Sequence, residues 1–254
     1  MTTTHVDVPS DSSQATTQMQ VHLNHITPLH ICSDAIRQCW QSQEKSDSYE
    51  LVPSGEVECG PNDKALIDRI GNKYKHASTL EHITCNFTIE GISRALLQEL
   101  ARHRIASLSV KSTRYTLKEL KASEPIMTYV EHDEDGDVIG HDINMEVAAR
   151  FLVLLPEDST GLNEQLNIEN VVQLMKLRKF LQAGMANDKA KYCLPEAYKT
   201  SLAWTINARS LQNFLALRTS KSALWEIRQL ANCVFDALPE EYKYIFDHCI
   251  STVN

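Results

Sequence analysis

Hydrophobic runs long enough to cross a bilayer are missing from this sequence of 254 residues. A transmembrane helix needs about 18 to 20 consecutive apolar residues, and no stretch approaches that length. The first residues also lack a basic region followed by an apolar one, which is the pattern of a secretory signal. We therefore expect a cytoplasmic protein that does not insert into membranes.

Residue spacings typical of metal sites are missing as well. The seven cysteines are scattered without a Cys-x-x-Cys pair, and the ten histidines show neither His-x-x-x-His nor His-Glu-x-x-His. The acidic stretch 131–137 begins like a calcium-binding loop, but its twelfth position is Asp142 where that loop needs glutamate, so a solvated hairpin turn is predicted. We expect reduced, mostly buried cysteines and no bound metal.

Positive charge is in deficit, with 25 Lys and Arg against 33 Asp and Glu and a formal net charge of −8. This balance argues against general binding to nucleic acid or to a membrane surface, so any anion site must be local. Residues 1–20 are rich in Thr, Ser and Gln, and we expect them to form a flexible N-terminal tail. Residues 21–254 are expected to form one domain with a sizeable core.

Alternation of apolar and polar residues marks the clearest strand. It runs from His82 to Glu90, and Gly91 is expected to end it. A partly buried helix is predicted to follow and to end at Arg104. A second alternation over 202–206 predicts another strand, and apolar periodicity predicts helices over 208–219 and 222–238. The residues of the last helix expected to be buried are Leu224, Ile227, Leu230, Val234 and Leu238.

Two helices are predicted ahead of the first strand. Thr27 as N-cap and Pro28 as the first helical residue open one of them, and Asp63 as N-cap opens the other. The polar, turn-rich stretch 41–61 between them is predicted to be a loop. The face of the first helix expected to be buried carries Ile31, Ala35, Cys39 and Trp40.

Basic residues gather in the segment 102–115, which reads Arg-His-Arg-Ile-Ala-Ser-Leu-Ser-Val-Lys-Ser-Thr-Arg-Tyr. The adjacent cations Arg102, His103 and Arg104 repel one another, and a bound phosphate would relieve that repulsion. Cations are also favoured in the last turn of a helix, so a purely structural role stays open. On a helix that ends at Arg104, Glu99 shares a face with Arg102 and His103, either as an ion pair or to hold the polar edge of a ligand.

Ser112 follows in a segment expected to be a loop. A nucleophilic serine needs a base within hydrogen-bond reach, and no Gly-x-Ser-x-Gly elbow surrounds this one. Contact with a phosphate or a nucleobase is therefore the favoured role of Ser112.

A second polar cluster runs from a strand end into a helix and comprises Asn207, Arg209, Asn213 and Arg218. Arg209 and Asn213 share a helix face, whereas Arg209 and Arg218 lie about 180° apart. Ligands bound by both arginines would lie on different sides, and the alternative is two surface arginines and a helix cap. Lys191 is a further candidate cation, with ordinary solvent exposure as its alternative.

Arg102-His103-Arg104 followed after seven residues by Ser112 resembles the signature of the flavin-dependent thymidylate synthases. Ser78-Thr79-Leu80-Glu81-His82 is similar to that family's Ser/Thr-x-x-Glu-His element, and Gly91-Ile92-Ser93-Arg94 to its helix start. The stretch 207–218 is similar to its C-terminal element. The order and spacing agree from about Val21 to Asp247.

This resemblance implies a homotetramer of α+β subunits, each an antiparallel sheet with helices packed around it, and active sites shared between chains. It implies methylation of dUMP to dTMP with 5,10-methylenetetrahydrofolate as carbon donor and FAD, reduced by NADPH, as hydride source. Arg218 matches the arginine that favours ionisation of the uracil ring. By position, the FAD contacts would be Ser78, Glu81, Arg102, His103, Arg104, Asn207, Arg209 and Asn213. By position, the residues around dUMP would be Glu99, Arg102, Ser112, Thr113, Arg114, Lys191 and Arg218.

The sequence departs from the family pattern at several of these positions. Lys191 replaces an arginine, which keeps the charge but loses the bidentate geometry and predicts looser phosphate binding. Val110 replaces a glutamate and cannot make its polar contacts. The other departures are Glu99 for Gln, Ser109 for Asn, Thr113 for Gly or Gln, and Ser222 for His.

Two alternative functions stay open. The same chemistry on UMP or dCMP is one, since Glu99, Val110 and Thr113 are expected near the base. A flavin-free nucleic-acid-binding module is the other, although the acidic balance and the scarcity of aromatics among the cations disfavour it.

Overall fold

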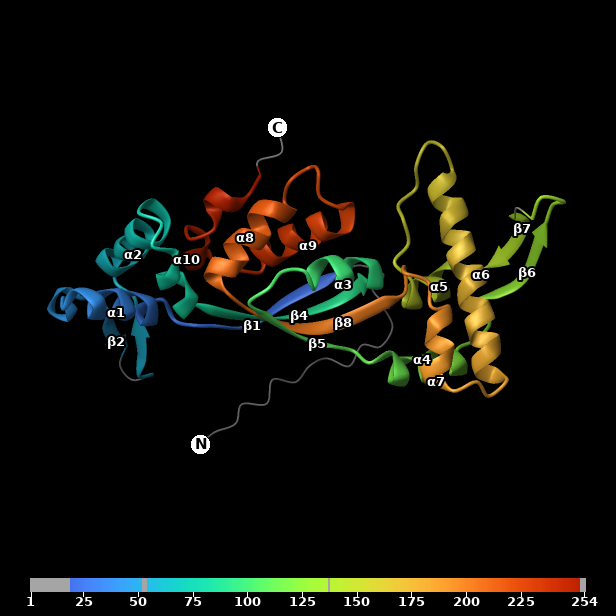
Figure 1. The fold of residues 1–254 in the computed structure, drawn as a ribbon, viewed down its shortest axis with the longest axis horizontal. Helices are drawn as coiled ribbons and strands as arrows, with labels where there is room; N and C mark the ends of the chain where they lie inside the picture. Colours follow the sequence, from blue (N-terminus) through green and yellow to red (C-terminus); the bar gives the residue numbers. More distant parts are fainter. Residues whose placement is uncertain (1–18, 52–53, 137, 252–254) are drawn as a thin grey trace.

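A four-stranded antiparallel sheet forms the centre of an elongated molecule (Figure 1), in the computed structural model that describes residues 19–51, 54–136 and 138–251. Its strand order is β1 (Gln20–Ile26), β4 (Thr84–Ser93), β8 (Lys199–Asn207), β5 (Ala106–Val110). An antiparallel sheet with packed helices is the α+β class that the family resemblance implies. Most of the predicted tail lies outside the described residues, and β1 begins at Gln20.

The two predicted strands are confirmed as β4 and β8. Cys85 and Phe87 of β4 and Trp204 and Ile206 of β8 are buried on the face that the helices cover. The prediction that Gly91 ends the first strand was wrong. Gly91 takes a φ of 73° beside an irregularity in the pairing with β8, and the strand continues to Ser93. Glycine adopts this left-handed conformation without a steric cost, so the strand bends there and does not stop.

One face of the sheet is covered by α3 (Arg94–Leu100), α8 (Ala208–Arg218) and α9 (Trp225–Asp236), as Figure 1 shows. The last two confirm the helices predicted over 208–219 and 222–238, although Leu224, just ahead of α9, is exposed and not buried as its place in the apolar pattern suggested. The Trp204 ring lies between those of Phe87 and Phe214, with centroids 6.0 and 5.1 Å away. The aromatic core therefore joins the sheet to α8.

The opposite face of the sheet is polar. Asn24 of β1 donates hydrogen bonds to Asn86 and Thr88 of β4, and Asn86 donates to Thr205 of β8 at 2.7 Å. These side chains are exposed or half-buried in the single chain. This face is suited to contact water or another polar surface.

A lobe at one end of the sheet contains the first two helices and a hairpin (Figure 1). Its elements are α1 (Leu29–Trp40), η1 (Gln43–Lys45), β2 (Tyr49–Leu51), β3 (Glu56–Glu58), α2 (Pro61–Ile67), the π-helical turn η2 (Asp68–Lys73) and η3 (Ala77–His82). The prediction of an unstructured loop over 41–61 was wrong, because β2 and β3 pair there. Short, polar two-stranded hairpins leave no apolar alternation from which to predict them.

The burial predicted for α1 was also wrong. Its buried residues are Leu29, Cys32, Ser33, Ile36 and Arg37, whereas the Trp40 side chain is 68% exposed. Thr27 does not cap this helix, because its hydroxyl instead pairs with the backbone of Thr84, the first residue of β4. Two faces of α1 carry apolar residues at helical spacing. The face that is buried is the one that also carries the buried Arg37.

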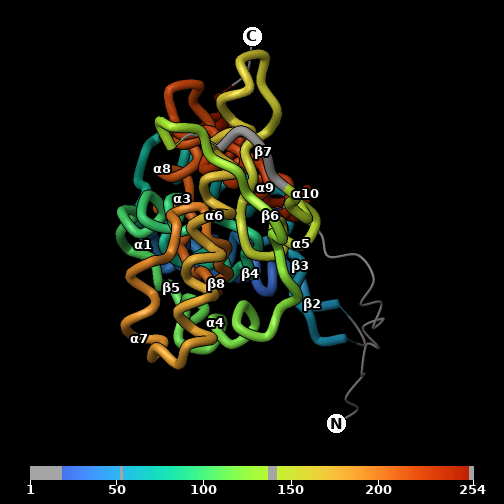
Figure 2. Tube along the Cα trace, turned by 90° about the vertical axis from the view of Figure 1, so that its right-hand side faces the viewer, coloured from blue at the N-terminus to red at the C-terminus, as the bar shows by residue number. Residues whose placement is uncertain are grey.

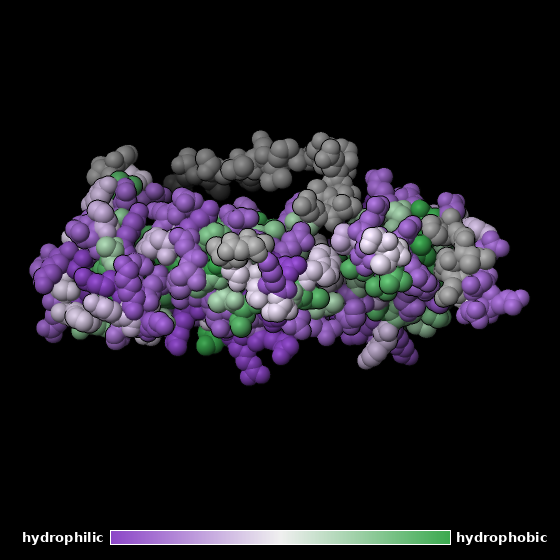
Figure 3. All heavy atoms as spheres, turned by 90° about the horizontal axis from the view of Figure 1, so that it is seen from above, coloured by the Kyte–Doolittle hydropathy of each residue, from purple (hydrophilic) through white to green (hydrophobic). Residues whose placement is uncertain are grey.

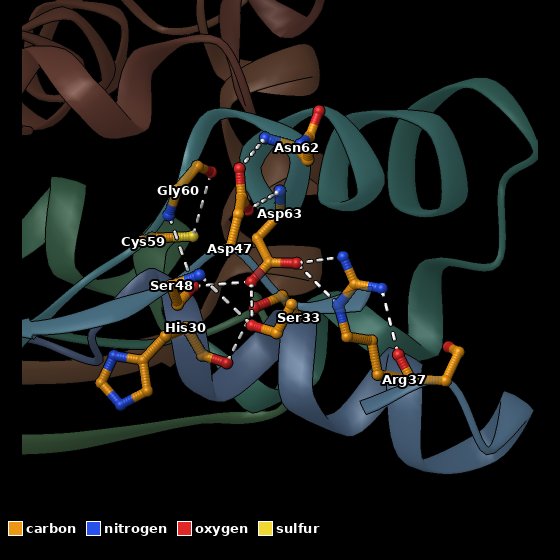
Figure 4. Close-up of polar contacts among 11 residues, drawn as sticks. His30, Ser33, Arg37, Asp47, Ser48, Cys59, Gly60, Asn62 and Asp63 are labelled. Atoms are coloured by element: carbon orange, nitrogen blue, oxygen red, sulfur yellow. Dashed lines mark hydrogen bonds and ion pairs between the residues drawn. The ribbon is translucent and has the colours of Figure 1, made fainter. Parts of the chain in front are cut away.

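Arg37 of α1 forms an ion pair with Asp63 of α2, and their side chains are 7% and 0% exposed (Figure 4). Arg37 Nε donates to Asp63 Oδ1 at 2.7 Å, and the hydroxyls of Ser46 and Ser48 donate to Oδ2 at 2.6 Å each. The prediction of Asp63 as the N-cap of α2 was wrong, because Asp63 lies inside the helix and its carboxylate is the partner of Arg37. Asp47 accepts hydrogen bonds from the first backbone N–H groups of α2 instead.

The lobe at the other end of the sheet has a hydrophobic cluster of its own. It contains α4 (Thr113–Ala122), β6 (Met127–His132), β7 (Val138–Ile143), α5 (Met145–Phe151), α6 (Leu162–Gln182), α7 (Asn187–Ala190) and η4 (Lys191–Cys193). Figure 2 shows α4, α6 and α7 side by side in this lobe. Residues 131–136 of the acidic stretch lie at the end of β6, where it pairs with β7 in the predicted hairpin.

The chain ends with α10 (Glu240–Lys243) and η5 (Asp247–Cys249), which pack near α2 and α8. Seen from above, hydrophilic side chains cover most of the surface, with hydrophobic ones in small groups (Figure 3). No helix in the described part of the chain is long and apolar enough to span a membrane. All seven cysteines are free thiols, of which Cys39 is exposed.

Glu226 fastens α9 to the start of α3. Its carboxylate accepts hydrogen bonds from the backbone N–H of Ser93, at 2.7 Å, and from the Ser93 hydroxyl, which in turn caps Leu96 N–H of α3. The Glu226 side chain is 4% exposed, and burial raises its pKa above the ordinary 4.5 despite the opposing effect of these hydrogen bonds. The contact fixes the helix that carries Glu99.

We expect Glu226→Ala to lower the free energy of unfolding by about 1 to 3 kcal/mol, because the buried Ser93 N–H loses its acceptor. Glu226→Gln keeps an acceptor and removes the buried charge, so its cost at neutral pH is expected to be under about 1 kcal/mol. A raised carboxyl pKa means that the contribution of Glu226 to stability is greatest at low pH and falls as the pH rises from 4.5 through the folded-state pKa. Urea unfolding at several pH values measures both effects, and Glu226→Gln should lose this pH dependence. Equal stability of the Ala and Gln variants would contradict this role.

Candidate functional site

The basic segment begins in a turn and not in the last turn of a helix. Helix α3 ends at Leu100, so the predicted helix through Arg104 was wrong. The chain reverses at Ile105, whose φ is 62°, and enters β5 at Ala106. Arg102 and Arg104 are exposed while His103 is buried, so the turn separates cations that a helix would keep adjacent.

Arg218, the last residue of α8, is the centre of a hydrogen-bonded network. Its Nε donates to His103 Nε2 at 2.8 Å, and its Nη2 lies 3.1 Å from Glu99 Oε2. The other Glu99 oxygen lies 3.5 Å from Arg102 Nη1. The Arg218 side chain is only 18% exposed, so these contacts hold it with less competition from water than a surface arginine has. The four residues come from α3, the turn after it, and α8.

These residues line a pocket of about 620 Å³. Its polar wall includes Arg102, Arg104 and Arg218, and apolar side chains complete it. The full lining is Arg102, His103, Arg104, Ile105, Asn213, Leu217, Arg218, Ser222 and Ala223. Sequence reasoning had not assigned Ile105, Leu217 or Ala223, because an exposed apolar residue that faces a pocket gives no periodic signal.

Burial lowers the pKa of His103 below the ordinary 6.5, and the neighbouring Arg218 and Arg102 lower it further against the opposing effect of Glu99. The ring packs edge-on against Phe214, with centroids 5.0 Å apart. His103 is therefore neutral near pH 7. Since Nε2 accepts the hydrogen bond from Arg218, the ring proton is on Nδ1.

Arg209 belongs to a second group on the other side of α8. Its Nη1 lies 2.6 Å from Glu81 Oε1, and both side chains are about half-exposed. Asn207 caps α8 by accepting a hydrogen bond from Ser210 N–H at 2.8 Å, as the helix-cap alternative held. Ser78 is exposed on η3, the element that also carries Glu81. Arg209 and Arg218 thus contact different elements, in agreement with their spacing.

Ser112, Thr113, Arg114 and Lys191 form a third group at α4 and η4. Ser112 occupies the N-cap position of α4 but makes no side-chain cap there. Asn187 of α7 donates to the Arg114 carbonyl at 2.6 Å, which fastens the turn before Lys191 to α4. Figure 1 shows α4 and α7 well apart from α8. Within one chain, the residues predicted around dUMP therefore lie in two places.

Residues 23–242 match the family described as thymidylate synthase complementing protein. The chain belongs to this family. It is 55% identical over 228 residues to a flavin-dependent thymidylate synthase of Wolinella succinogenes, covering 90% of this chain and 97% of that protein. It is 54% identical over 232 residues to one from Campylobacter jejuni, covering 91% and 98%.

A solved structure from Helicobacter pylori has a similar fold. It is thymidylate synthase X with FAD and dUMP, with a TM-score of 0.76, 48% identity, and coverage of 92% of this chain and all of that one. The family resemblance deduced from the short motifs is therefore confirmed. The prediction of an enzyme of the flavin-dependent thymidylate synthase class is confirmed as well.

Two of the departures from the thymidylate synthase complementing protein pattern lie at the pocket and at the end of β5. Ser222 lines the pocket, and its hydroxyl lies 2.9 Å from that of Ser220. Val110, at the end of β5, is exposed. Among the residues that the structure describes, no cluster of His, Cys, Asp and Glu is arranged to hold a metal ion.

Ile105 takes a backbone conformation that is strained for a β-branched residue. A β-branched residue with φ of 62° costs about 1 to 2 kcal/mol, and its side chain is 73% exposed. We expect Ile105→Gly to raise the free energy of unfolding by about 0.5 to 1 kcal/mol, since relief of strain exceeds the added entropy of the unfolded chain. Ile105→Val keeps the branched side chain and serves as control. A glycine variant less stable than wild type in urea unfolding would show that the turn is not strained.

Proposed function

We propose that this chain methylates dUMP to dTMP with 5,10-methylenetetrahydrofolate as carbon donor and FAD, reduced by NADPH, as the hydride source. The observation that carries the proposal is Arg218, held at a cationic pocket by His103 and Glu99. The flavin-dependent names of the relatives, and the FAD and dUMP in the Helicobacter pylori structure, support it.

The residues present fit phosphate-bearing ligands. Arg102 and Arg104 are exposed beside the pocket, and Arg209 presents a third guanidinium outside it. Guanidinium groups bind phosphate oxygens through paired N–H donors, and the apolar side chains of Ile105 and Leu217 suit a planar ring. In this proposal FAD contacts Ser78, Glu81, Arg102, His103, Arg104, Asn207, Arg209 and Asn213.

Arg218 is proposed to act on the uracil ring of dUMP. Its fixed cation stabilises the negative charge that develops when the ring ionises, and a pre-oriented donor does this without reorganisation. Lys191, Arg114, Ser112 and Thr113 are proposed to hold the nucleotide, with Glu99 and Arg102 beside it. When bound, reduced FAD supplies a hydride and the folate supplies the one-carbon unit.

The assembly is proposed to be a homotetramer whose active sites combine residues of more than one chain. Two observations support this. The group of Ser112, Thr113, Arg114 and Lys191 at α4 and η4 lies apart from the Arg218 pocket in a single chain (Figure 1). Among the described residues, no helix covers the polar face of the sheet. A second copy of the chain would place its α4 and η4 residues beside the Arg218 pocket of the first copy. It would also cover the polar face of the sheet.

The test uses purified protein with bound FAD, identified by its visible absorption. The flavin is reduced anaerobically with NADPH, and dUMP with methylenetetrahydrofolate is then added. We expect reoxidation of the flavin together with dTMP, and little product from UMP or dCMP in parallel reactions. Product from UMP or dCMP alone would transfer the proposal to that nucleotide. Failure to bind FAD, with DNA or RNA binding that weakens steeply with salt, would favour the nucleic-acid-binding alternative.

A further inference from the structure

We propose that His103, besides its proposed contact with FAD, is a positioning residue for Arg218, and that its neutral form sets the acid limit of activity. This inference rests on the proposed role of Arg218 toward dUMP. His103 and Arg218 are 115 residues apart in the chain, so the contact exists only in the folded protein. The bond is charge-assisted, because its donor is a guanidinium and its acceptor is a neutral ring nitrogen.

The geometry leaves Arg218 little rotational freedom. Nε is bound to His103 and Nη2 to Glu99, so two separate atoms of the planar guanidinium are fixed from two different elements. Nη1 takes part in neither contact. His103 is itself fixed, since its ring packs edge-on against Phe214, which contacts Trp204 in the core. The rigid aromatic core therefore orients the guanidinium through one imidazole.

Protonation of His103 would remove this restraint. An imidazolium has no acceptor, so Arg218 Nε would face a second cation at a donor-to-donor distance where it now makes a hydrogen bond. The charged groups that act on His103 are Arg218 from α8, Glu99 from α3, and Arg102 in its own turn, with Arg104 also lining the pocket. One carboxylate thus faces three guanidinium groups, and a further positive charge is disfavoured. Burial, Arg218 and Arg102 lower the pKa of His103 against the opposing effect of Glu99, so the neutral form persists below pH 6.5.

The proposal explains why a histidine stands between two arginines. A third arginine or a lysine at position 103 would have no acceptor for Arg218, and an aliphatic residue would leave Nε without a partner. An imidazole supplies an acceptor on a rigid ring that also packs against Phe214.

Two substitutions separate positioning from packing. His103→Gln places an amide oxygen within reach of Arg218 Nε and accepts a hydrogen bond at every pH, whereas His103→Phe keeps a ring against Phe214 but has no acceptor. His132→Gln is the matched control, because His132 is exposed on β6, away from the pocket. For each protein, kcat and KM for dUMP are measured from about pH 5 to about pH 8, with FAD absorbance and the thermal unfolding midpoint as checks of folding.

Wild type and His132→Gln are expected to lose kcat together as the pH falls through the lowered pKa of His103, and His103→Gln is expected to lose much less over the same range. His103→Phe is expected to have a kcat on the order of a hundredfold below wild type at every pH. An acid loss in His103→Gln equal to that of wild type would overturn the proposal. So would a folded, FAD-containing His103→Phe with a kcat within about threefold of wild type.

A ring titration of His103 by NMR decides the contact without any turnover. Wild type is expected to show a pKa below 6.5, and Arg218→Met is expected to raise it by removal of the adjacent cation. If the pKa of His103 were the same in Arg218→Met as in wild type, the contact between His103 and Arg218 would be contradicted. If wild type forms no dTMP at any pH while Arg218→Met does raise this pKa, the proposed function fails and the positioning of Arg218 by His103 stands.

Discussion

Arg218→Met should lower the kcat for dTMP formation by about a hundred- to a thousandfold, which is the usual effect of removing one fixed donor from a developing negative charge. The methionine side chain replaces the aliphatic stem of arginine but has no charge and no donors. KM for dUMP should change less than kcat, because the interaction strengthens as the ring ionises. The measurement is dTMP formation at saturating dUMP, with FAD content compared by absorbance.

Arg218→Lys distinguishes charge from geometry. A lysine keeps the positive charge but cannot hold His103 and Glu99 through two separate nitrogens of one plane, as Arg218 does. We expect it to recover only a small part of the lost rate. Arg150→Met is the matched control, since Arg150 of α5 forms an exposed ion pair with Glu124, away from the Arg218 pocket. A folded Arg218→Met that retains FAD and a rate similar to Arg150→Met would contradict a catalytic role.

Arg37→Met should lower the free energy of unfolding by about 3 to 5 kcal/mol, because it leaves the Asp63 carboxylate buried without its cation. Asp63 is completely buried, and the hydroxyls of Ser46 and Ser48 cannot neutralise its charge. Removal of both charges, in Arg37→Met with Asp63→Asn, should cost less than the sum of the single changes. Arg150→Met again provides the control, at about 0 to 1 kcal/mol for an exposed pair. If the double variant lost as much free energy of unfolding in urea as the two single variants together, the two residues would act independently.

The same pair gives a pH dependence of definite sign. Burial raises the pKa of Asp63, but the hydrogen bonds from Ser46, Ser48 and Arg37 together outweigh it and hold the pKa below the ordinary 3.8. A lowered carboxyl pKa stabilises the fold above pH 3.8, and this stability is lost as the pH falls through the folded-state pKa. Wild type should therefore lose stability in acid more steeply than Asp63→Asn. This lobe carries Ser78 and Glu81, so the ion pair also holds the proposed FAD contacts in place.

Several parts of the fold follow from local pattern. The alternation over 82–90 and 202–206 predicted two central strands, because a sheet with one buried face imposes a period of two on each strand. The periodicity over 208–219 predicted α8 for the corresponding reason. The close grouping of Arg102, His103 and Arg104 predicted an anion site, and that site stays a prediction.

Other parts were misjudged where local pattern allows more than one solution. In α1, both Ile31 and Cys32 begin an apolar spacing, and the sequence does not say which face meets α2. Asp63 is acceptable as a cap by residue type, yet the buried Arg37 requires a carboxylate partner and Asp63 supplies it. Asp47 instead accepts hydrogen bonds from the first N–H groups of α2. Gly91 is compatible with a strand end or a bulge, and the pairing of β4 with β8 selected the bulge.

The sequence by itself determined the family, the two central strands and the residue types of the site, since these depend on short spacings and on side-chain chemistry. Only the tertiary structure decided that Arg218 is held by His103 and Glu99, that Asp63 is buried against Arg37, and that the α4 group lies apart from the Arg218 pocket in one chain. The physical reason is that each of these facts joins segments distant in sequence. Packing of the whole core, and the need to pair every buried charge, selects such contacts, and no local spacing records them.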